Sequence, residues 1–409
     1  MKRNVIVGQA GGPCAVFNAI LAGVFHMADD SQTTVLGMMN GLQGLLQERI
    51  VNLSDTIRTQ YDLEVLRTTP SAYLGSCRYM LPDAEKDHSS YDRIFDILRK
   101  NNISCFYYIG GREALVSIDQ LSTYGRMIGC DDIKIIGIPK TIDNNIKMTD
   151  HAPGFGSAAK YVATSVKELI RDNMVNNTDI VTVVEIMGRE TGWLTAASTL
   201  CKGDDCPGPD FIYLPEVPMD PDEAIAQIKE VKERKHSVLV CIGEGVRLKD
   251  GKYLCDEAMD YPMTDIFGRK MLTGSARALA KRIHEQLGCR TRAVEFSALQ
   301  RSASHMSSKT DNDEAFMIGE NAVKASNDRH TSEMIYFTRE SNSPYMVSTH
   351  LCDVRDITTD PMTVPLSWVK KDNTGMTKKF EEYARPLIMG EIQVHYENGL
   401  PVHVPYINI

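Results

Sequence analysis

The chain has 409 residues, of which 43% are hydrophobic and 24% are charged, so it is long enough to form two packed domains with sizeable cores. Its formal net charge of −9 argues against nucleic acid as the main partner, and no apolar run approaches the length of a membrane span. The 10 cysteines are scattered and form no CxxC pair, so we expect a reduced, cytoplasmic protein.

Apolar and β-branched runs alternate with helical patterns along most of the chain. In the first part we predict strands at residues 4–7, 33–38, 104–109 and 133–138, and helices at 15–27, 92–98 and from 113 onward. In the second part we predict strands at 180–187, 211–214, 238–242 and 291–296, with helices after 156 and at 271–287. This alternation indicates an α/β fold with βαβ units and mainly parallel sheets.

The predicted strands are more than one sheet holds comfortably, so we divide the chain into domains at residues 1–140 and 141–305. Residues 306–409 are less regular. They contain predicted helices at 315–326 and 377–385 and predicted strands at 334–338 and 345–350.

Glycine-rich turns follow two strands of the first domain. Gly11 and Gly12 lie between a strand and a helix, where backbone N–H groups and the helix N-terminus suit a phosphate. An ordinary tight turn is the alternative. The pair at 110–111 repeats the arrangement, and Glu113 after it suits a magnesium ligand or, equally, complements the helix macrodipole.

A polar turn follows the strand at 133–138, and it contains Lys140 and Asp143. If the turn is extended, Thr141, Asp143 and Asn145 face one side. A lysine and a carboxylate at a strand end suit phosphoryl transfer, because the cation neutralises phosphate charge and the carboxylate accepts a hydroxyl proton. An Asx turn that caps the strand is the alternative.

Later strands also end in charged turns. Arg189 follows a strand directly, and Glu244 stands between two glycines in a pattern that suits sugar hydroxyls. Arg290, Arg292, Gln300 and Arg301 form a basic cluster, and arginine binds phosphate bidentately. Solvated arginines and ordinary βα turns are the alternatives.

The loop at 149–157 leads into a helix, for which we predict Gly156 or Ser157 as the N-cap. We interpret His151 in this loop as a hydrogen-bonding group rather than a catalyst.

Together these segments resemble the phosphofructokinase family over roughly residues 4–305. The motifs that match in family order are Gly11-Gly12, Gly110-Gly111, residues 139–144, residues 153–156, Met187-Gly188-Arg189, Gly243-Glu244-Gly245 and Arg292 with Gln300-Arg301. The chain looks most like the branch that uses pyrophosphate in place of ATP. That branch carries a lysine where Lys140 stands and an acidic residue where Glu113 stands, and a bulky side chain at Glu113 would crowd a nucleotide.

The resemblance implies two Rossmann-like, three-layer αβα domains with the active site in the cleft between them. Residues 1–140 would form the side that binds the phosphoryl donor and residues 141–305 the sugar-phosphate side, with 306–409 as a C-terminal extension packing back on both. Arg292 would reach in from a neighbouring subunit, which implies a homodimer or homotetramer. Mg²⁺ is the implied cofactor, with Glu113 as its ligand.

The resemblance also implies a role for each site residue. Asp143 would be the base that takes the 1-hydroxyl proton of fructose 6-phosphate. The donor phosphates would be held by Lys140, Gly11 and Gly12, with Arg78 as a further contact. The sugar would be bound by Thr141, Met187, Gly188, Arg189 and Glu244, and its 6-phosphate by Arg292 and Arg301.

Three residues depart from the family pattern. Arg112 stands where the family usually has aspartate or asparagine near the metal, Asn145 replaces an aspartate, and Ala298 replaces a histidine of many members. From the resemblance as a whole we predict reversible, pyrophosphate-dependent phosphorylation of fructose 6-phosphate in glycolysis or gluconeogenesis. The alternatives are an ATP-dependent enzyme, a catalytically impaired subunit that binds sugar phosphate and regulates a partner, and a kinase with another acceptor.

Overall fold

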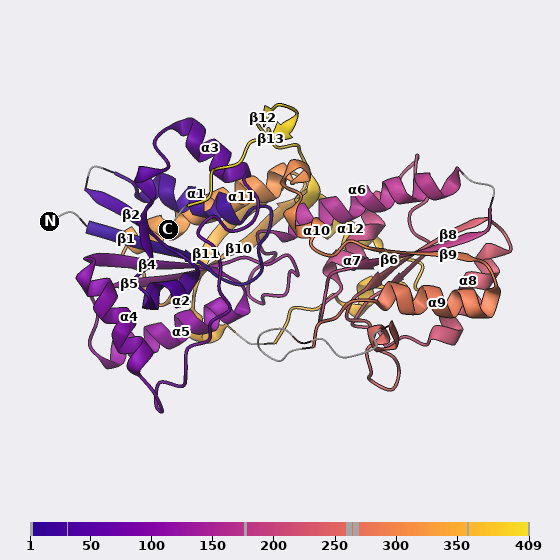
Figure 1. Cartoon of the computed structure of the whole chain (residues 1–409), viewed down its shortest axis with the longest axis horizontal. Coiled ribbons are helices and arrows are strands. Elements are labelled where there is room, and N and C mark those ends of the chain that lie inside the picture. The colour runs from indigo at the N-terminus through magenta and orange to yellow at the C-terminus, as the bar shows by residue number, and fades with distance from the viewer. Residues whose placement is uncertain are drawn as a thin grey trace.

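The structure is a computed structural model that describes residues 3–30, 32–175, 178–258, 264, 270–357 and 360–407. These residues form two sheets of mainly parallel strands, each with helices on both faces, so the predicted α/β fold is confirmed (Figure 1). Within the described residues, no helix is both long enough and apolar enough to cross a membrane.

The first sheet has seven strands in the order β11-β10-β5-β4-β1-β2-β3. They are β1 (Arg3–Gln9), β2 (Thr33–Met38), β3 (Ile50–Asn52), β4 (Ile103–Gly110), β5 (Lys134–Pro139), β10 (Glu333–Asn342) and β11 (Tyr345–Asp353). The edge strands β3 and β11 are antiparallel to their neighbours, and the five strands between them are parallel. The carboxyl ends of β1, β4 and β5 therefore meet at one edge, where open α/β sheets bind ligands.

Helices cover both faces of this sheet because its strands carry apolar side chains on both sides. One face packs against α1 (Phe17–Ala28), α3 (Gln60–Thr68) and α11 (Lys309–Asn327), and the other against α2 (Gly41–Leu46), α4 (Ser89–Lys100) and α5 (Arg112–Met127). Val5 and Val7 face the first group of helices, whereas Ile6 faces the second, as the two-residue period of a strand requires.

The second sheet has four parallel strands in the order β7-β8-β6-β9. They are β6 (Ile180–Ile186), β7 (Phe211–Tyr213), β8 (Ser237–Gly243) and β9 (Arg290–Glu295). The helices α6 (Phe155–Met174) and α7 (Trp193–Ala197) cover one face, and α8 (Pro221–Lys232) and α9 (Ser275–Leu287) cover the other. Among the described residues beyond β9, the other α-helices and strands are α10 (Leu299–Ser302), α12 (Lys378–Ala384) and the small pair β12 (Tyr396–Glu397) and β13 (Leu400–Pro401).

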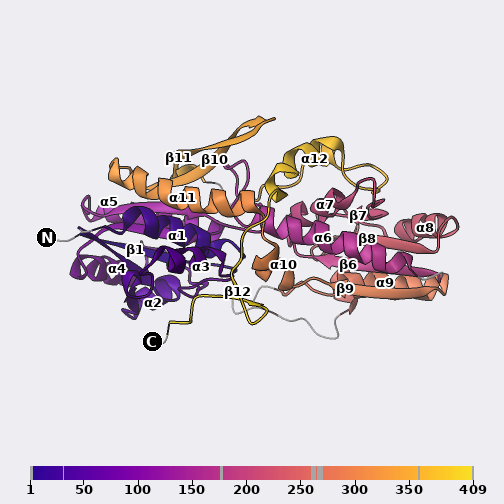
Figure 2. The ribbon, with the colours of Figure 1, turned by 90° about the horizontal axis from the view of Figure 1, so that it is seen from above.

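The residues after 305 contact both halves of the molecule. α11 packs so closely on α1 that a Cβ added to Gly23 would lie 2.0 Å from the carbonyl oxygen of Phe316. α12 lies over the second half, where Phe380 stacks on Trp193 with ring centroids 6.3 Å apart (Figure 2). The domain limits at 140 and 305 stay predictions.

Several predicted helix starts are wrong, among them that of α11, which begins at Lys309 rather than 315. α6 begins at Phe155 after Gly154, whose φ is 106°, and not after an N-cap at Gly156 or Ser157. The carboxylate of Asp311 accepts hydrogen bonds from the backbone N–H groups of Gly154 and Ser157, so a distant side chain satisfies this helix end. α9 begins at Ser275 rather than 271, again after a glycine with positive φ, Gly274.

Candidate active site

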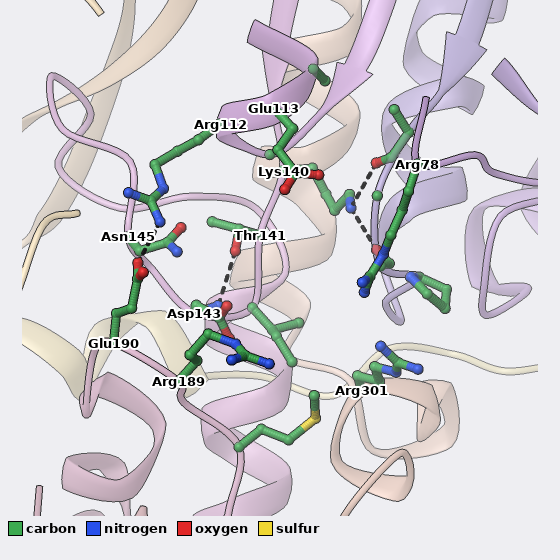
Figure 3. Close-up of a pocket in the computed structure, with 18 of the residues that line it drawn as sticks. Arg78, Arg112, Glu113, Lys140, Thr141, Asp143, Asn145, Arg189, Glu190 and Arg301 are labelled. Atoms are coloured by element: carbon green, nitrogen blue, oxygen red, sulfur yellow. Dashed lines mark hydrogen bonds and ion pairs between the residues drawn. The ribbon is translucent and has the colours of Figure 1, made fainter. Parts of the chain in front are cut away.

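A cavity of about 400 Å³ lies between the two sheets, at the carboxyl ends of their strands (Figure 3). Its wall includes most of the residues that the sequence singles out, namely Gly11, Gly12, Arg78, Glu113, Lys140, Thr141, Asp143, Met187, Arg189, Glu244 and Arg301. It also includes Arg112, Asn145 and Glu190. The fold thus collects charged groups from turns more than 200 residues apart into one site.

The diglycine turn after β1 forms one wall of this cavity. Gly11 has a φ of 82°, which a side chain would strain, and its backbone N–H donates to the carbonyl oxygen of Cys77. A Cβ on Gly12 would lie 3.3 Å from Nη1 of Arg301, so this turn and α10 approach each other across the cavity. Because the segment at 76–78 is bound to the turn, Arg78 lies at the same wall.

Lys140 is 2% exposed and lies beneath the diglycine turn. Its Nζ donates to the carbonyl oxygen of Gly12 at 2.6 Å and, more weakly, to that of Ala10 at 3.4 Å. The ammonium also lies 4.0 Å from the ring centroid of Phe17. Burial lowers the pKa of Lys140 to about 8, although the charge of Asp143 acts in the opposite direction.

The turn that carries Asp143 is not the extended segment that the alternation of residues 141–145 suggested. The backbone N–H of Asp143 donates to Oγ1 of Thr141 at 3.1 Å, and Asn144 is left-handed with a φ of 49°. Even so, Thr141, Asp143 and Asn145 all line the cavity, while Asn144 is fully buried on the other side.

Asp143 faces the cavity with cations around it. Burial raises its pKa, whereas the charges of Lys140, Arg112 and Arg301 act against that rise. Its backbone carbonyl accepts a hydrogen bond from Oγ1 of Thr191, which fixes the turn to the second half of the molecule. A carboxylate held in this way is placed to accept a proton from a bound hydroxyl group.

The far side of the turn is bound by the C-terminal part of the chain. Nδ2 of Asn144 donates to the hydroxyl of Tyr383 at 2.8 Å, and that hydroxyl donates to the carbonyl oxygen of Asp150 at 2.8 Å. His151 is buried between Asp150 and Glu314, each 2.8 Å away, so its prediction as a hydrogen-bonding group in the loop is confirmed. Burial alone would lower the pKa of His151, but the two carboxylates raise it to about 9.

The second sheet contributes Met187, Arg189 and Glu244 to the cavity. Nη2 of Arg189 donates to the carbonyl oxygen of Lys270 at 2.6 Å. Burial, together with the charge of Asp143, raises the pKa of Glu244 to about 8, so this carboxyl group is largely protonated at neutral pH.

Two predicted site residues do not line this cavity. Gly188 shapes the turn instead: its φ is 148°, and a Cβ there would lie 2.3 Å from the carbonyl oxygen of Thr191. Arg292 lies on β9, where Nη1 pairs with Oδ2 of Asp172 at 2.8 Å. An arginine that serves a neighbouring subunit would also lie outside the cavity of its own chain.

Glu190 is a cavity residue to which the sequence assigned no role. It follows Arg189 directly, and this position at a strand end was the available signal. Oε2 of Glu190 accepts a hydrogen bond from Nη2 of Arg112 at 2.6 Å (Figure 3).

The carboxylate of Glu113, which lines the cavity, would hold a magnesium ion. Among the described residues, no three His, Cys, Asp or Glu side chains are grouped as a metal cage. Mg²⁺ usually binds through one or two carboxylates together with substrate phosphates, so the residues present fit that mode.

Comparisons with known proteins agree with one another. The family described as phosphofructokinase matches residues 4–326. The chain is 34% identical over 405 residues to a pyrophosphate–fructose 6-phosphate 1-phosphotransferase of Halomonas elongata, covering 98% of this chain and 95% of that one. It is 32% identical to a sulfofructose kinase of Alkalicoccus urumqiensis, covering 90% and 88%. The crystal structure of a pyrophosphate-dependent phosphofructokinase from Nitrosospira multiformis superposes with a TM-score of 0.88 at 30% identity, covering 100% and 98%.

Proposed function

The chain belongs to the phosphofructokinase family, and on that premise we propose that it transfers a phosphoryl group from pyrophosphate to fructose 6-phosphate. The product is fructose 1,6-bisphosphate. The observation that carries the proposal is the position of Asp143, whose carboxylate faces a cavity that also contains Lys140 and the diglycine turn. Relatives that match almost the whole chain carry the name of this reaction.

In the proposed reaction, Asp143 accepts the proton of the sugar 1-hydroxyl as its oxygen bonds to phosphorus. The bond from phosphorus to the bridging oxygen breaks, and inorganic phosphate leaves. Backbone N–H groups of the diglycine turn and the surrounding cations stabilise the charge of the transferring group. Catalysis then consists mainly of positioning and electrostatics, and the reaction runs in both directions because no nucleotide is consumed.

Two residues favour pyrophosphate over ATP as the donor. Lys140 is buried beneath the diglycine turn and brings a positive charge to the phosphate end of the cavity. Glu113 lines the same wall, on the first turn of α5. The family resemblance implies that a bulky side chain at this position crowds a nucleotide. A bulky side chain at that point leaves room for a small inorganic donor and less room for a nucleotide.

The remaining roles follow the family pattern. The sugar contacts Thr141, Met187, Arg189 and Glu244, and Gly188 shapes the turn between Met187 and Arg189. The 6-phosphate is bound by Arg301 and by Arg292 of a neighbouring subunit. The active protein is therefore a homodimer or homotetramer, and we place it in the cytoplasm. Glu113 would hold Mg²⁺ together with substrate oxygens, and the ion would neutralise part of the donor charge.

The direct test is an assay of the purified chain with fructose 6-phosphate, Mg²⁺ and either pyrophosphate or ATP. We expect fructose 1,6-bisphosphate to form with pyrophosphate and at least about 100-fold more slowly with ATP, a difference of about 2.7 kcal/mol in activation free energy. Turnover with ATP alone would overturn the donor assignment. Binding of fructose 6-phosphate without turnover on either donor would favour the alternative of a regulatory subunit. Faster turnover with sulfofructose than with fructose 6-phosphate would show that sulfofructose is the acceptor.

A further inference from the structure

The ion pair between Arg112 and Glu190 joins the two sides of the cavity. Arg112 is the first residue of α5, after the diglycine pair that ends β4, and Glu190 belongs to the turn after β6. Figure 3 shows the two side chains pointing toward one another beside Asn145, with the contact of 2.6 Å drawn between them. The contact therefore links a donor-side helix to a sugar-side turn.

The stability of α5 does not explain the presence of this arginine. A helix N-terminus carries partial positive charge, so a cation in the first turn opposes the helix dipole. Glu113, next to Arg112, is the kind of acidic residue that a helix N-terminus favours. An arginine at this position is better explained by the cavity that its side chain lines.

The ion pair is accessible to a competing anion. The side chain of Arg112 is 23% exposed and that of Glu190 is 47% exposed, and ion pairs that solvent reaches in this way contribute little stability. Phosphate is a stronger partner for a guanidinium group than a single carboxylate oxygen, because it carries more charge and accepts two parallel hydrogen bonds. Glu190 can turn outward into solvent when a phosphate takes its place.

The pair also lies close to the reacting group. The charges of Arg112 and Glu190 both act on Asp143, in opposite directions. Moving Glu190 away from Arg112 would make the net charge near Asp143 more positive.

We propose that Arg112 is a ligand of the transferring phosphoryl group, and that Glu190 holds it across the cleft until the pyrophosphate anion displaces the carboxylate. This inference rests on the proposed function and extends it, because it gives a binding role to a residue that departs from the family pattern. Glu190 competes with the donor for Arg112 within the same molecule. A donor therefore binds Arg112 only if its negative charge is large enough to displace the carboxylate of Glu190.

A double-mutant cycle with Arg112→Gln and Glu190→Gln tests the proposal. The readouts are pyrophosphate binding by calorimetry without sugar, and KM and kcat for pyrophosphate with fructose 6-phosphate. We expect Arg112→Gln to weaken pyrophosphate binding at least about tenfold and Glu190→Gln to tighten it about threefold. In the Arg112→Gln background, Glu190→Gln should change binding by less than about 1.5-fold, because its effect acts through the arginine.

Two further variants serve as controls. Arg112→Lys keeps the charge but loses the planar fork, so it should restore only part of the binding. Glu257→Gln removes the same charge from another Arg–Glu pair, the one with Arg282 at 2.7 Å, and it should leave pyrophosphate binding unchanged.

The outcomes separate this inference from the function on which it rests. If the wild-type chain binds and uses pyrophosphate but Arg112→Gln binds it equally well, the inference is overturned and the function stands. The inference is also overturned if Glu190→Gln tightens pyrophosphate binding in the Arg112→Gln background. If the wild-type chain does not bind pyrophosphate, both fail together.

Discussion

At the scale of single residues, the site is a small set of ionisable groups whose surroundings change their charge. Lys140 and Glu244 line the same cavity, and their ionised forms carry opposite charges. Burial lowers the pKa of Lys140 and raises the pKa of Glu244, in each case to about 8. Below that pH, Lys140 is positive and Glu244 is neutral. Above it, Lys140 loses its charge and Glu244 gains one, so the cavity becomes less attractive to anionic substrates.

This predicts that KM for fructose 6-phosphate rises between pH 7 and pH 9. For a single group with a pKa of about 8, the competent form falls by about tenfold at pH 9. Glu244→Gln should make the rise in KM with pH smaller. Because the substrate ionises identically in both assays, the difference between the KM profiles of wild type and variant reports the ionisation of Glu244. KM profiles measured in parallel check this; an equal rise in the variant would exclude Glu244 as the titrating group.

Most of these residues could be predicted from the sequence, because they follow strands whose ends meet in a parallel sheet. Lys140, Asp143, Arg189 and Glu244 were found in this way, and all four line the cavity. The geometry within the turn could not be predicted. Asn144 adopts a left-handed conformation, so the segment is a turn and not extended, although Thr141, Asp143 and Asn145 still line the cavity.

At the scale of structural elements, the turn at 141–145 is held by parts of the chain that are distant in sequence. Thr191 binds the carbonyl group of Asp143, and Tyr383 of α12 binds Asn144 from behind. These contacts place the C-terminal part of the chain against the back of the reacting group. Sequence patterns do not predict them, because Asn144 and Tyr383 are 239 residues apart and meet only through tertiary packing.

Tyr383→Phe should therefore loosen the turn while leaving the cavity wall intact. We expect kcat to fall about tenfold with KM for both substrates within about twofold, and the free energy of unfolding to fall by about 1–3 kcal/mol, the cost of unpaired buried polar groups. Steady-state kinetics and chemical denaturation check this.

Tyr213→Phe is the matched control, because the buried hydroxyl of Tyr213 has no hydrogen-bond partner within the described structure. That variant should keep both kcat and stability. Equal losses in the two variants would show that the hydroxyl of Tyr383 has no special role in holding the turn.

At the scale of the whole molecule, two sheets place their strand ends on opposite sides of one cavity, and the C-terminal part of the chain contacts both halves (Figure 2). The α/β class could be predicted because strands and helices alternate over most of the chain. The addition of β10 and β11 to the first sheet could not, since those strands follow all of the second sheet in sequence.

The position of Arg292 leads to a prediction about assembly. If this arginine serves the site of a neighbouring subunit, Arg292→Ala should raise KM for fructose 6-phosphate at least tenfold although it lies outside its own cavity. Arg292→Ala and Asp143→Asn chains, mixed and reassembled, should then regain about one quarter of wild-type activity in a dimer, because half of the dimers carry one intact site. Absence of recovery from chains shown by native mass spectrometry to form mixed dimers would place Arg292 outside the site.

The most direct test of the account is the turnover of Asp143→Asn with pyrophosphate and fructose 6-phosphate, measured beside calorimetric binding of the sugar phosphate. A positioned general base contributes about 10²–10⁴-fold, so we predict a fall in kcat of that size with sugar-phosphate affinity within about threefold. A variant that binds the sugar phosphate and keeps kcat within tenfold of wild type would contradict the assignment of Asp143 as the base.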